Sequence, residues 1–284
     1  MAKINFICMA FVAITLSMTF SSCSNDNADE NKASNNNEVN PSNVFTGDRI
    51  QKAGTMAFTY DKDGFVTSIN DDGSNVTFQY VAATRSGRQC KEVIITIPGD
   101  DAEPSYTITC QIGNNGFISS GIDSSDHDTW AFEYDGDGHL IKMVRSEGNN
   151  TVSTMTYKDG DIVSSTEIDD DDIAAEKKGS NATISYTSAN YATPIENKGG
   201  VMEFDEMFNV DMDEMSYAYY AGLLGKPTKH LPLACNRTYD SAEGETGDEL
   251  LAMVWTFNKE GYPTQLKYTE DGIPVDDWHI DYEW

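Results

Sequence analysis

Hydrophobic and polar residues alternate along most of this chain, as they do in half-buried β-strands. Trp130, Phe132 and Tyr134 would lie on one face of such a strand. Ala131 and Glu133 would lie on its other face. This period of two recurs in many short runs, so the sequence predicts a mainly β fold built from antiparallel strands.

Polar turn residues separate these runs at regular places. Each run is followed by Asp, Asn or Lys residues and a Gly, and then by another run, which is the pattern of a β-hairpin. Three successive turn centres are 22 and 23 residues apart, the length of two strands and two turns. We predict a meander that curves into an open sheet or a partial barrel. The hairpins are FTYDKDGFVTSI (58–69), CQIGNNGFISSGI (110–122), FEYDGDGHLIKMV (132–144), MTYKDGDIVSST (155–166) and WTFNKEGYPTQLKY (255–268).

One segment departs from the alternation and predicts a helix over about 211–225. Asp211 and Glu214 can form a capping pair at its start, and Gly225 can close its end. We expect its apolar face to pack on the concave side of the sheet. The apolar residues at helical spacing are Met212, Met215, Tyr219 and Leu223.

The first residues have the layout of a secretory signal, in which Lys3 precedes an apolar run and small residues. The stretch ending at Cys23 resembles a bacterial lipobox, in which the cysteine becomes the first residue and its thiol is acylated. Acyl chains would anchor the protein in a membrane. The predicted organisation is a signal peptide over 1–22, an acylated Cys23 with a disordered Asn- and Asp-rich tether over 23–45, and a single β-meander domain over 46–284.

The residues that follow Cys23 bear on the location. Ser24 to Glu30 resemble the acidic export signal of Bacteroides-type surface lipoproteins. That resemblance implies an outer-membrane lipoprotein that is exposed at the cell surface. The alternative is an anchor that faces the periplasm, with the acidic residues serving only as a solvated linker.

The charge of the chain excludes one class of partner. With 19 basic and 47 acidic residues, the formal net charge is −28. Removal of Lys3 with the signal leaves 18 basic residues against 47 acidic ones. Such a field repels nucleic acid, so we predict no nucleic-acid partner.

Three cysteines remain after Cys23, an odd number for an oxidising compartment. Cys90 and Cys110 lie on two strand-like runs joined by a turn, so a hairpin would bring them near each other. A disulfide between them and a pair of reduced core thiols are both open outcomes. The redox state of Cys235 is open as well.

The Asp-rich turns do not fit the calcium loop of an EF-hand. An EF-hand loop needs a glutamate at its twelfth position. A loop that starts at Glu133 has Val144 there, and one that starts at Thr59 has Asn70. Turn formation explains these residues better, and Asp169 to Asp172 predict a solvated loop. We therefore predict no metal site and no cofactor. The four histidines form no metal-binding pair on one helix: His127, His139, His230 and His279.

Several of these features together resemble a known family. The lipobox, the Y-D-x-D-G hairpins, AGLLGKPTKHLP and FNKEGYPTQLKY are similar to Bacteroides-type lipoproteins of a domain family of unknown function with a porin-like fold. The resemblance covers roughly 50–284. It implies a curved antiparallel meander with a helix against it. It implies no established activity and no catalytic residues.

The final run, WHIDYEW, predicts a closing or edge strand. We disfavour a membrane-spanning barrel, because charges interleave on both faces of the other strands and a lipid anchor would then be redundant.

The sequence carries no catalytic motif, so we predict a binding or interaction module that is not an enzyme. Its partner would be a glycan or an outer-membrane protein. Two alternatives stay open: a secreted carboxylate-dependent hydrolase that acts on glycans, and a structural partner of an outer-membrane complex. Flat rings that suit a sugar, or that fill a sheet core, are Trp130, Trp255, Trp278 and Trp284.

Overall fold

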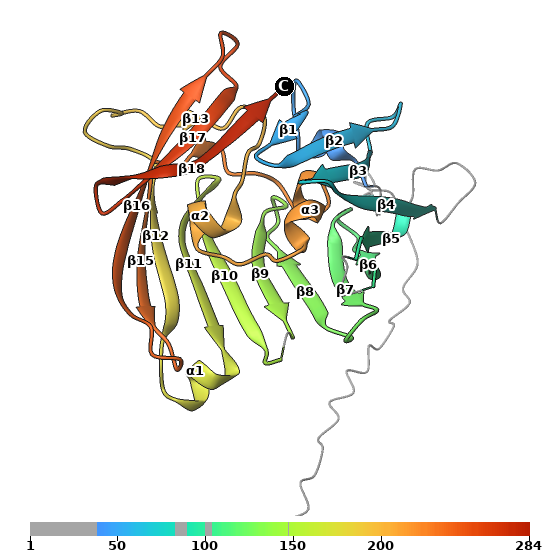
Figure 1. Cartoon of the computed structure of the whole chain (residues 1–284), viewed down its shortest axis with the longest axis horizontal. Coiled ribbons are helices and arrows are strands. Elements are labelled where there is room, and N and C mark those ends of the chain that lie inside the picture. Colours follow the sequence, from blue (N-terminus) through green and yellow to red (C-terminus); the bar gives the residue numbers. More distant parts are fainter. Residues whose placement is uncertain (1–38, 83–89, 100–103, 147) are drawn as a thin grey trace, which may run out of the picture. The chain divides into compact units, whose positions relative to one another are not determined.

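The predicted hairpins join into one antiparallel barrel (Figure 1). The computed structural model describes residues 39–82, 90–99, 104–146 and 148–284. Within these ranges, sixteen strands pair in the order β1-β18-β17-β16-β15-β12-β11-β10-β9-β8-β7-β6-β5-β4-β3-β2, and β2 returns to β1. The predictions for the signal peptide, for Cys23 and for the export signal lie outside the described residues.

The strands of the barrel are β1 (Lys52–Ala53), β2 (Met56–Tyr60), β3 (Val66–Asp71), β4 (Ser74–Ala82), β5 (Cys90–Ile97), β6 (Tyr106–Ile112), β7 (Ile118–Asp123), β8 (Thr129–Tyr134), β9 (Leu140–Arg145), β10 (Thr151–Lys158), β11 (Asp161–Asp169), β12 (Gly179–Ser185), β15 (Ala234–Asp240), β16 (Thr246–Phe257), β17 (Pro263–Glu270) and β18 (Ile273–Glu283). A separate two-stranded sheet contains β13 (Ile195–Glu196) and β14 (His230–Leu231). All five hairpins read from the sequence are confirmed.

The prediction of an open sheet or a partial barrel is wrong, because the sheet closes. The last strand pairs with the first, with Lys52 opposite Glu283 and Ala53 opposite Tyr282. Hairpin signals report only neighbours in the sequence, whereas closure depends on a pairing between the two ends of the chain. Of the two outcomes predicted for WHIDYEW, a closing strand or an edge strand, the closing strand is observed.

The alternation of the sequence becomes an inner and an outer face of the wall. On β8, Trp130 and Phe132 are buried, while Thr129, Ala131 and Glu133 are exposed. Other strands follow the same rule, so the apolar positions face the lumen. The lumen is therefore a hydrophobic core that other residues must fill.

A plug, defined as residues 201–224, fills that lumen. It contains α2 (Phe204–Phe208) and α3 (Met215–Tyr220), which Figure 1 shows within the ring of strands. Its residues contact strands on every side of the ring. These contacts include Tyr220 with Phe58 on β2, Tyr217 with Asp71 on β3, Glu214 with Tyr106 on β6, Asp211 with Arg145 on β9, Asn209 with Ser180 on β12, Asp205 with Arg237 on β15 and Glu203 with Tyr282 on β18.

The predicted helix over 211–225 is shorter than expected. Asp213 has a φ of +50°, so the helix cannot begin before it, and Gly222 with a φ of +76° follows its end. The capping pair does not form, because Asp211 accepts a hydrogen bond from the backbone of Asp213 and no side chain caps α3. The four apolar residues that predicted the helix are all buried: Met212, Met215, Tyr219 and Leu223.

A short helix stands where the sequence predicted a loop. Asp169 to Asp172 are not a solvated loop, because α1 (Asp170–Ala174) begins there. The Asp169 carboxylate accepts the Asp172 N–H at 2.6 Å and caps the helix. Asp172 is buried and accepts the N–H of Ala242 at 2.6 Å. Acidic residues thus join α1 to the β15–β16 turn.

The end of the predicted tether is packed against the barrel unit. Residues 39–45 include a 3-10 helix (Pro41–Asn43), and Val39 and Val44 are buried. The ring of Phe45 meets that of Tyr219 edge to face at 5.8 Å. Residues 39–45, which the sequence assigned to the tether, therefore pack with the barrel domain.

The three cysteines that the structure describes are free and buried. Cys110 lies opposite Val93, three residues along β5 from Cys90. Three residues span about 10 Å of strand, which exceeds the Cα separation that a disulfide allows. The disulfide alternative is thus wrong, and Cys90, Cys110 and Cys235 are core thiols. No helix among the described residues is long and apolar enough to cross a membrane.

Candidate binding pocket at the turn end

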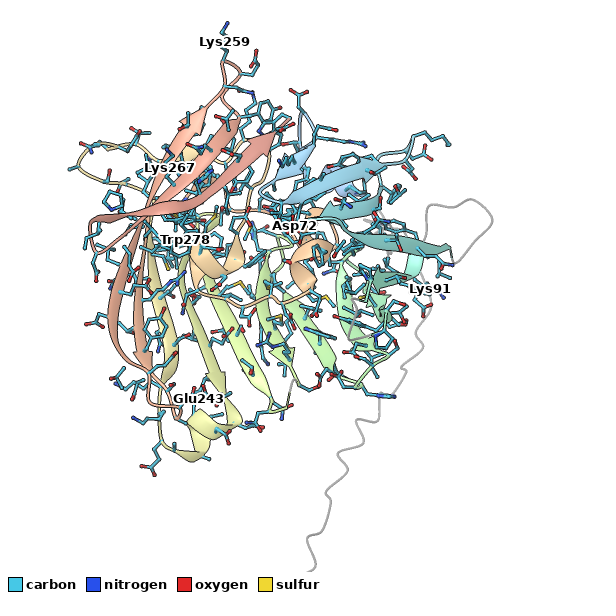
Figure 2. The ribbon with its side chains drawn as sticks, in the orientation of Figure 1. Asp72, Lys91, Glu243, Lys259, Lys267 and Trp278 are labelled. Carbon is cyan, nitrogen blue, oxygen red and sulfur yellow. The ribbon has the colours of Figure 1, made fainter. Side chains whose placement is uncertain are left out.

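The two ends of the barrel carry different connections. The turns at 61–65, 113–117, 135–139, 159–160 and 258–262 all lie at one end, here named the turn end. The opposite end, named the α1 end, carries α1 and the turn at 241–245. Figure 2 shows Lys259 at the tip of the β16–β17 turn and Glu243 at the far end of the molecule. The hairpins found in the sequence therefore share one rim.

Three of these turns have the same internal bonding. The side chain of the first residue accepts the N–H groups of the third and fifth residues, at 2.9 to 3.1 Å, and Gly occupies the fourth place with positive φ. The carboxylate or amide oxygen closes the loop without a metal. This supports the prediction that the turns are structural. The first residues are Asp61, Asp135 and Asn258.

The fifth residue of these turns packs its ring against the wall. It is Phe65 in one turn and Tyr262 in another, but it is His139 in the β8–β9 turn. The His139 ring stacks on Tyr157 with centroids 4.5 Å apart and planes at 21°. His139 thus takes a structural aromatic place with a ring that also carries two nitrogen atoms able to form hydrogen bonds. Comparison of the fifth positions was the signal that sequence analysis missed.

His139 is fixed by its own turn. Its Nδ1 lies 2.9 Å from the second carboxylate oxygen of Asp135, and 13% of its side chain is exposed. Burial raises the pKa of Asp135, but hydrogen bonds from the backbone and the ring of His139 outweigh burial and lower it. The ring is therefore held through Nδ1, and its Nε2 has no partner among the described residues.

A second histidine is held in the same way on the neighbouring hairpin. His230 Nδ1 lies 2.7 Å from Asp161, and the other carboxylate oxygen of Asp161 accepts the His230 N–H at 2.8 Å. The His230 ring also meets Tyr186 edge to face at 6.5 Å. Since 69 residues separate Asp161 from His230, no local pattern could have predicted this pair.

The segment 226–230, named the strap, brings the two histidines together. The N–H of Lys226 donates to Gly138 O, and the N–H of Lys229 donates to Gly160 O, both at 2.9 Å. The strap thus bridges the β8–β9 and β10–β11 turns through its main chain. Gly225 lets it approach, because a Cβ there would lie 2.9 Å from Gly138 O. Gly225 serves this contact and does not end a helix.

The turn-end pocket lies over the strap and has a volume of about 470 Å³. Lys226 and Lys229 are exposed, and their ammonium groups make no hydrogen bond or ion pair with any residue that the structure describes. Glu196 is the single carboxylate of the lining. The lining consists of Val44, His139, Glu196, Asn197, Lys226, Pro227, Thr228, Lys229 and His230.

Two polar side chains in the wall of this pocket, Asn197 and Thr228, already form hydrogen bonds with the protein. Buried Asn197 donates to Val201 O and accepts the Val201 N–H, and Thr228 donates to His230 O at 2.8 Å. The hydroxyl of Thr228 is therefore not available as a nucleophile. The groups that can meet a ligand are the two ammonium groups, the two Nε2 atoms and the Glu196 carboxylate.

Two acidic clusters have the spacing of metal ligands but are used by turns. Asp135 belongs to one of them with Asp137 and His139. Both of its oxygens accept hydrogen bonds within the turn, as described above. In the other, one oxygen of Asp123 accepts the N–H of Ser125 at 2.7 Å and closes the β7–β8 turn. Turn bonding accounts for these carboxylates.

A second cavity, of about 340 Å³, lies at the α1 end. Six carboxyl residues and two arginines line it, among them Glu167, Asp205 and Arg237. Burial raises the pKa of Glu167, with a hydrogen bond from Ser153 opposing it, and burial also raises the pKa of Asp205. Carboxylates that the sequence could not locate therefore gather here.

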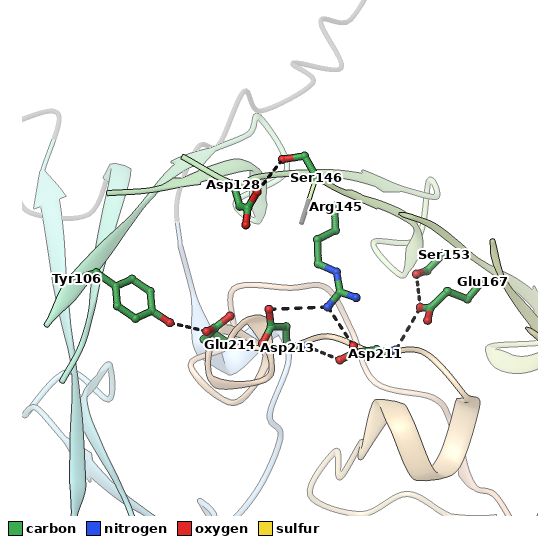
Figure 3. A network of polar contacts seen from close by, with 9 residues as sticks. All are labelled: Tyr106, Asp128, Arg145, Ser146, Ser153, Glu167, Asp211, Asp213 and Glu214. Carbon is green, nitrogen blue, oxygen red and sulfur yellow. Dashed lines mark hydrogen bonds and ion pairs between the residues drawn. The ribbon is translucent and has the colours of Figure 1, made fainter. Parts of the chain in front are cut away.

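The arginines of that cavity hold the plug. Figure 3 shows Arg145 turned toward Asp211 and Asp213, at 3.0 and 3.7 Å. Arg237 donates to Asp205 O at 2.6 Å and to Glu206 O at 3.0 Å, two main-chain carbonyls of α2. Their guanidinium groups are thus engaged by the protein itself.

The tryptophans do not form a sugar platform. Trp130 and Trp255 are buried in the core, and Trp255 donates to Pro232 O at 2.8 Å. Trp278 packs on Tyr268 and Trp284 on Tyr262, both with centroids 4.7 Å apart. The hypothesis that they fill the core of the barrel is the one that the structure favours.

Comparisons with known proteins give a family and a fold. A family model described as "Domain of unknown function (DUF4595) with porin-like fold" matches residues 110–265, which include the strap and both of its hairpins. A solved porin-like protein from Bacteroides uniformis is 14% identical, with a TM-score of 0.55, and the match covers 80% of this chain and 88% of that one. A second, from Bacteroides vulgatus, is 12% identical, with a TM-score of 0.54 and coverage of 84% and 99%. At this identity the likeness shows the fold alone. No curated protein matches the chain.

Proposed function

Because the chain belongs to the family described as a domain of unknown function (DUF4595) with porin-like fold, we propose a function that rests on its own pocket: it is a surface binding module without catalysis. The observation that carries this proposal is the turn-end pocket. There the strap sets two lysines, whose ammonium groups have no partner among the described residues, and two oriented histidines around about 470 Å³. Pockets of this size with a few converging polar groups suit small ligands.

The filled lumen supports a scaffold rather than a channel. The plug contacts strands around the whole ring, and its apolar residues Met207, Met215 and Leu223 have no exposed surface. A channel would need a polar passage through this core. The barrel would instead give the strap a rigid base.

We place the protein at the outer membrane through an acylated Cys23, with the barrel displayed at the cell surface. The polar outer face of strands such as β8 supports a barrel that lies outside the lipid. Labelling with a clickable fatty acid should mark the wild type and not Cys23→Ala. External protease on intact cells should digest the wild type. Equal labelling of both proteins contradicts the anchor, and protection from protease contradicts surface display.

A glycan is the first partner to test, and an outer-membrane protein is the second. A glycan array should be probed with the Cys23→Ala chain, which cannot be acylated. The variant Glu196→Trp fills the pocket at an exposed lining position. Its control is Glu270→Trp, the same change at an exposed strand end outside the pocket. Binding that only Glu196→Trp abolishes supports the proposal, and binding that both variants retain contradicts it.

A second candidate function follows from the α1-end cavity. Half-buried Glu167 and exposed Asp205 both line this cavity and have raised pKa values, which favours a carboxylate-dependent hydrolase. Incubation with polysaccharides and a count of new reducing ends would test it. Activity that Asp205→Asn removes while Glu270→Gln retains it would favour the hydrolase over the binding module.

A further inference from the structure

We propose that the turn-end pocket binds a saccharide that carries at least two acidic groups, one at each turn beneath the strap. This inference rests on the proposed binding function and adds the chemical class of the ligand. The two turns supply equivalent groups. At the β8–β9 turn, Lys226 of the strap lies over the turn that carries His139. At the β10–β11 turn, the strap contributes Lys229 and the adjacent His230.

The position of each lysine relative to its turn is set by close contacts. A Cβ at Gly138 would lie 3.5 Å from Cε of Lys226, so the Lys226 side chain extends over that turn. A Cβ at Gly160 would lie 3.4 Å from Cβ of Lys229, so Lys229 begins directly above the other turn. Main-chain hydrogen bonds fix the start of each side chain, while each ammonium group stays free for a ligand.

Neither lysine side chain has a partner among the residues that the structure describes, which is informative in so acidic a chain. With 47 acidic and 19 basic residues, a lysine has many carboxylates within reach. Two carboxylates of these hairpins, Asp135 and Asp161, are instead bonded to the histidines at 2.9 and 2.7 Å. The lining thus holds two ammonium groups and one carboxylate, that of Glu196, and a ligand oxyanion can pair with each ammonium group.

The histidines extend this donor set. In each Asp–His pair the carboxylate accepts from Nδ1, which leaves Nε2 as the atom that can meet a ligand. Side-chain exposures of 13% for His139 and 22% for His230 place a ring edge at the pocket surface. A protonated ring can donate its Nε2–H to the oxyanion that pairs with the lysine, and a neutral ring can accept a sugar hydroxyl at Nε2.

The spacing of the two turns restricts the ligand. The β8–β9 and β10–β11 hairpins are neighbours in the barrel order, so their turns lie two strands apart. Two strand spacings are about 10 Å. The ligand would thus carry its acidic groups about 10 Å apart, as carboxylates or sulfate esters on separate sugar units can.

Matched ligands can test charge without a change of backbone. Oligogalacturonate and its methyl ester differ only in their carboxylates, and dextran sulfate and dextran differ only in their sulfates. Titration calorimetry with the Cys23→Ala chain should show binding of at least one acidic member. Its neutral partner should bind at least tenfold more weakly. Raising the salt from about 0.05 M to about 0.5 M should weaken binding, because the lysines are exposed.

Variants assign the effect to the pocket. The double variant Lys226→Gln with Lys229→Gln should lose at least tenfold in affinity and keep its melting temperature, since the main chain holds the strap. The control Lys259→Gln removes an exposed lysine at the same end but outside the pocket, and it should bind like the wild type.

The outcomes separate this inference from the proposed function. Equal affinity for acidic and neutral members, lost in Glu196→Trp, would overturn the acidic ligand and leave a glycan-binding module. Failure of both acidic ligands to bind, with a neutral glycan bound at the pocket, would do the same. If nothing binds and no array glycan depends on Glu196, both proposals fail.

Discussion

At the α1 end, the side chains of Arg145 and Arg237 each hold a part of the plug, whereas at the turn end the side chains of Lys226 and Lys229 bind no residue that the structure describes. The arginines contact plug carboxylates and two main-chain carbonyls of α2. The lysines line a pocket of about 470 Å³ and have no partner among the described residues. Two cavities with charged walls thus differ in whether those charges are already in use.

The difference teaches how a charged wall should be interpreted. A buried guanidinium that pairs with the protein is part of the fold, even when it borders a cavity. An exposed ammonium on a main-chain support contributes little to the fold, so it can serve a ligand. The predictions below test this separation in order of expected effect.

The largest effect is expected for Arg237→Ala. The change removes the donor from Asp205 O and Glu206 O and leaves Glu249, 3.6 Å away, without its cation. We expect a loss of about 3–5 kcal/mol in the free energy of unfolding, measured in urea. Lys226→Ala, its control, should change it by less than about 0.5 kcal/mol. Similar losses in both variants would remove the distinction between the two ends.

The plug that separates the cavities should depend on its apolar residues. Leu223 has no exposed surface, and its carbonyl accepts the Ile118 N–H at 2.8 Å. Leu223→Ala should cost about 2–5 kcal/mol through lost burial and a cavity. Leu250, which is 42% exposed, gives the control, and Leu250→Ala should cost less than about 1 kcal/mol. A neutral Leu223→Ala would mean that the plug stands off the wall.

Glu203, a residue of the plug, should make the stability of the protein depend on pH. Burial raises its pKa to about 7, and hydrogen bonds from Tyr220 at 2.5 Å and Tyr282 at 3.1 Å only partly oppose this. The native state therefore binds a proton that the unfolded chain releases above its own pKa. Stability should be highest below about pH 4.5 for this group, fall through pH 7, and reach a deficit of about 3 kcal/mol above it.

The matched variant isolates this carboxyl group. Glu203→Gln keeps an acceptor for both tyrosines but has no charge to bury, so its advantage over the wild type should grow from about pH 5 to about pH 8. Glu270→Gln, at an exposed position, should show no such trend. A constant difference between Glu203→Gln and the wild type would refute a titration of Glu203 in this range.

The smallest effect on stability is expected for His139→Phe. The same turn position holds Phe65 and Phe117 in other hairpins, and a phenyl ring can keep the stack on Tyr157. The lost bond to Asp135 should cost about 1 kcal/mol or less. Binding of the acidic saccharide should weaken, because Nε2 is gone. A large loss of stability would show that His139 is needed by the fold.

The hairpins were predictable because their signals are local. An Asp or Asn, a Gly and two alternating runs lie within about a dozen residues, and each resulting turn satisfies its own backbone groups. Closure was not predictable, since β1 has only the two residues Lys52–Ala53 and pairs with the far end of the chain. An alternating pattern cannot identify a strand of that length.

The plug and the pocket were predictable only in part. Helical spacing identified the buried residues around Leu223, but α2 and α3 have five and six residues, too short for a clear period. The segment GKPTKH is part of the sequence that carries the family resemblance, and it contains the strap. The hydrogen bonds of the strap could not be predicted, because Asp161 and His230 are 69 residues apart and share no local motif.

The main-chain attachment of the strap has a consequence for divergence within a family. Lys226 and Lys229 contribute only N–H groups to its support, and every residue except proline can supply one. Mutations at these two positions can therefore accumulate without a folding penalty. Related chains could retain the barrel, the plug and the turns while the side chains above the two hairpins drift, so that one scaffold yields receptors with different ligand preferences.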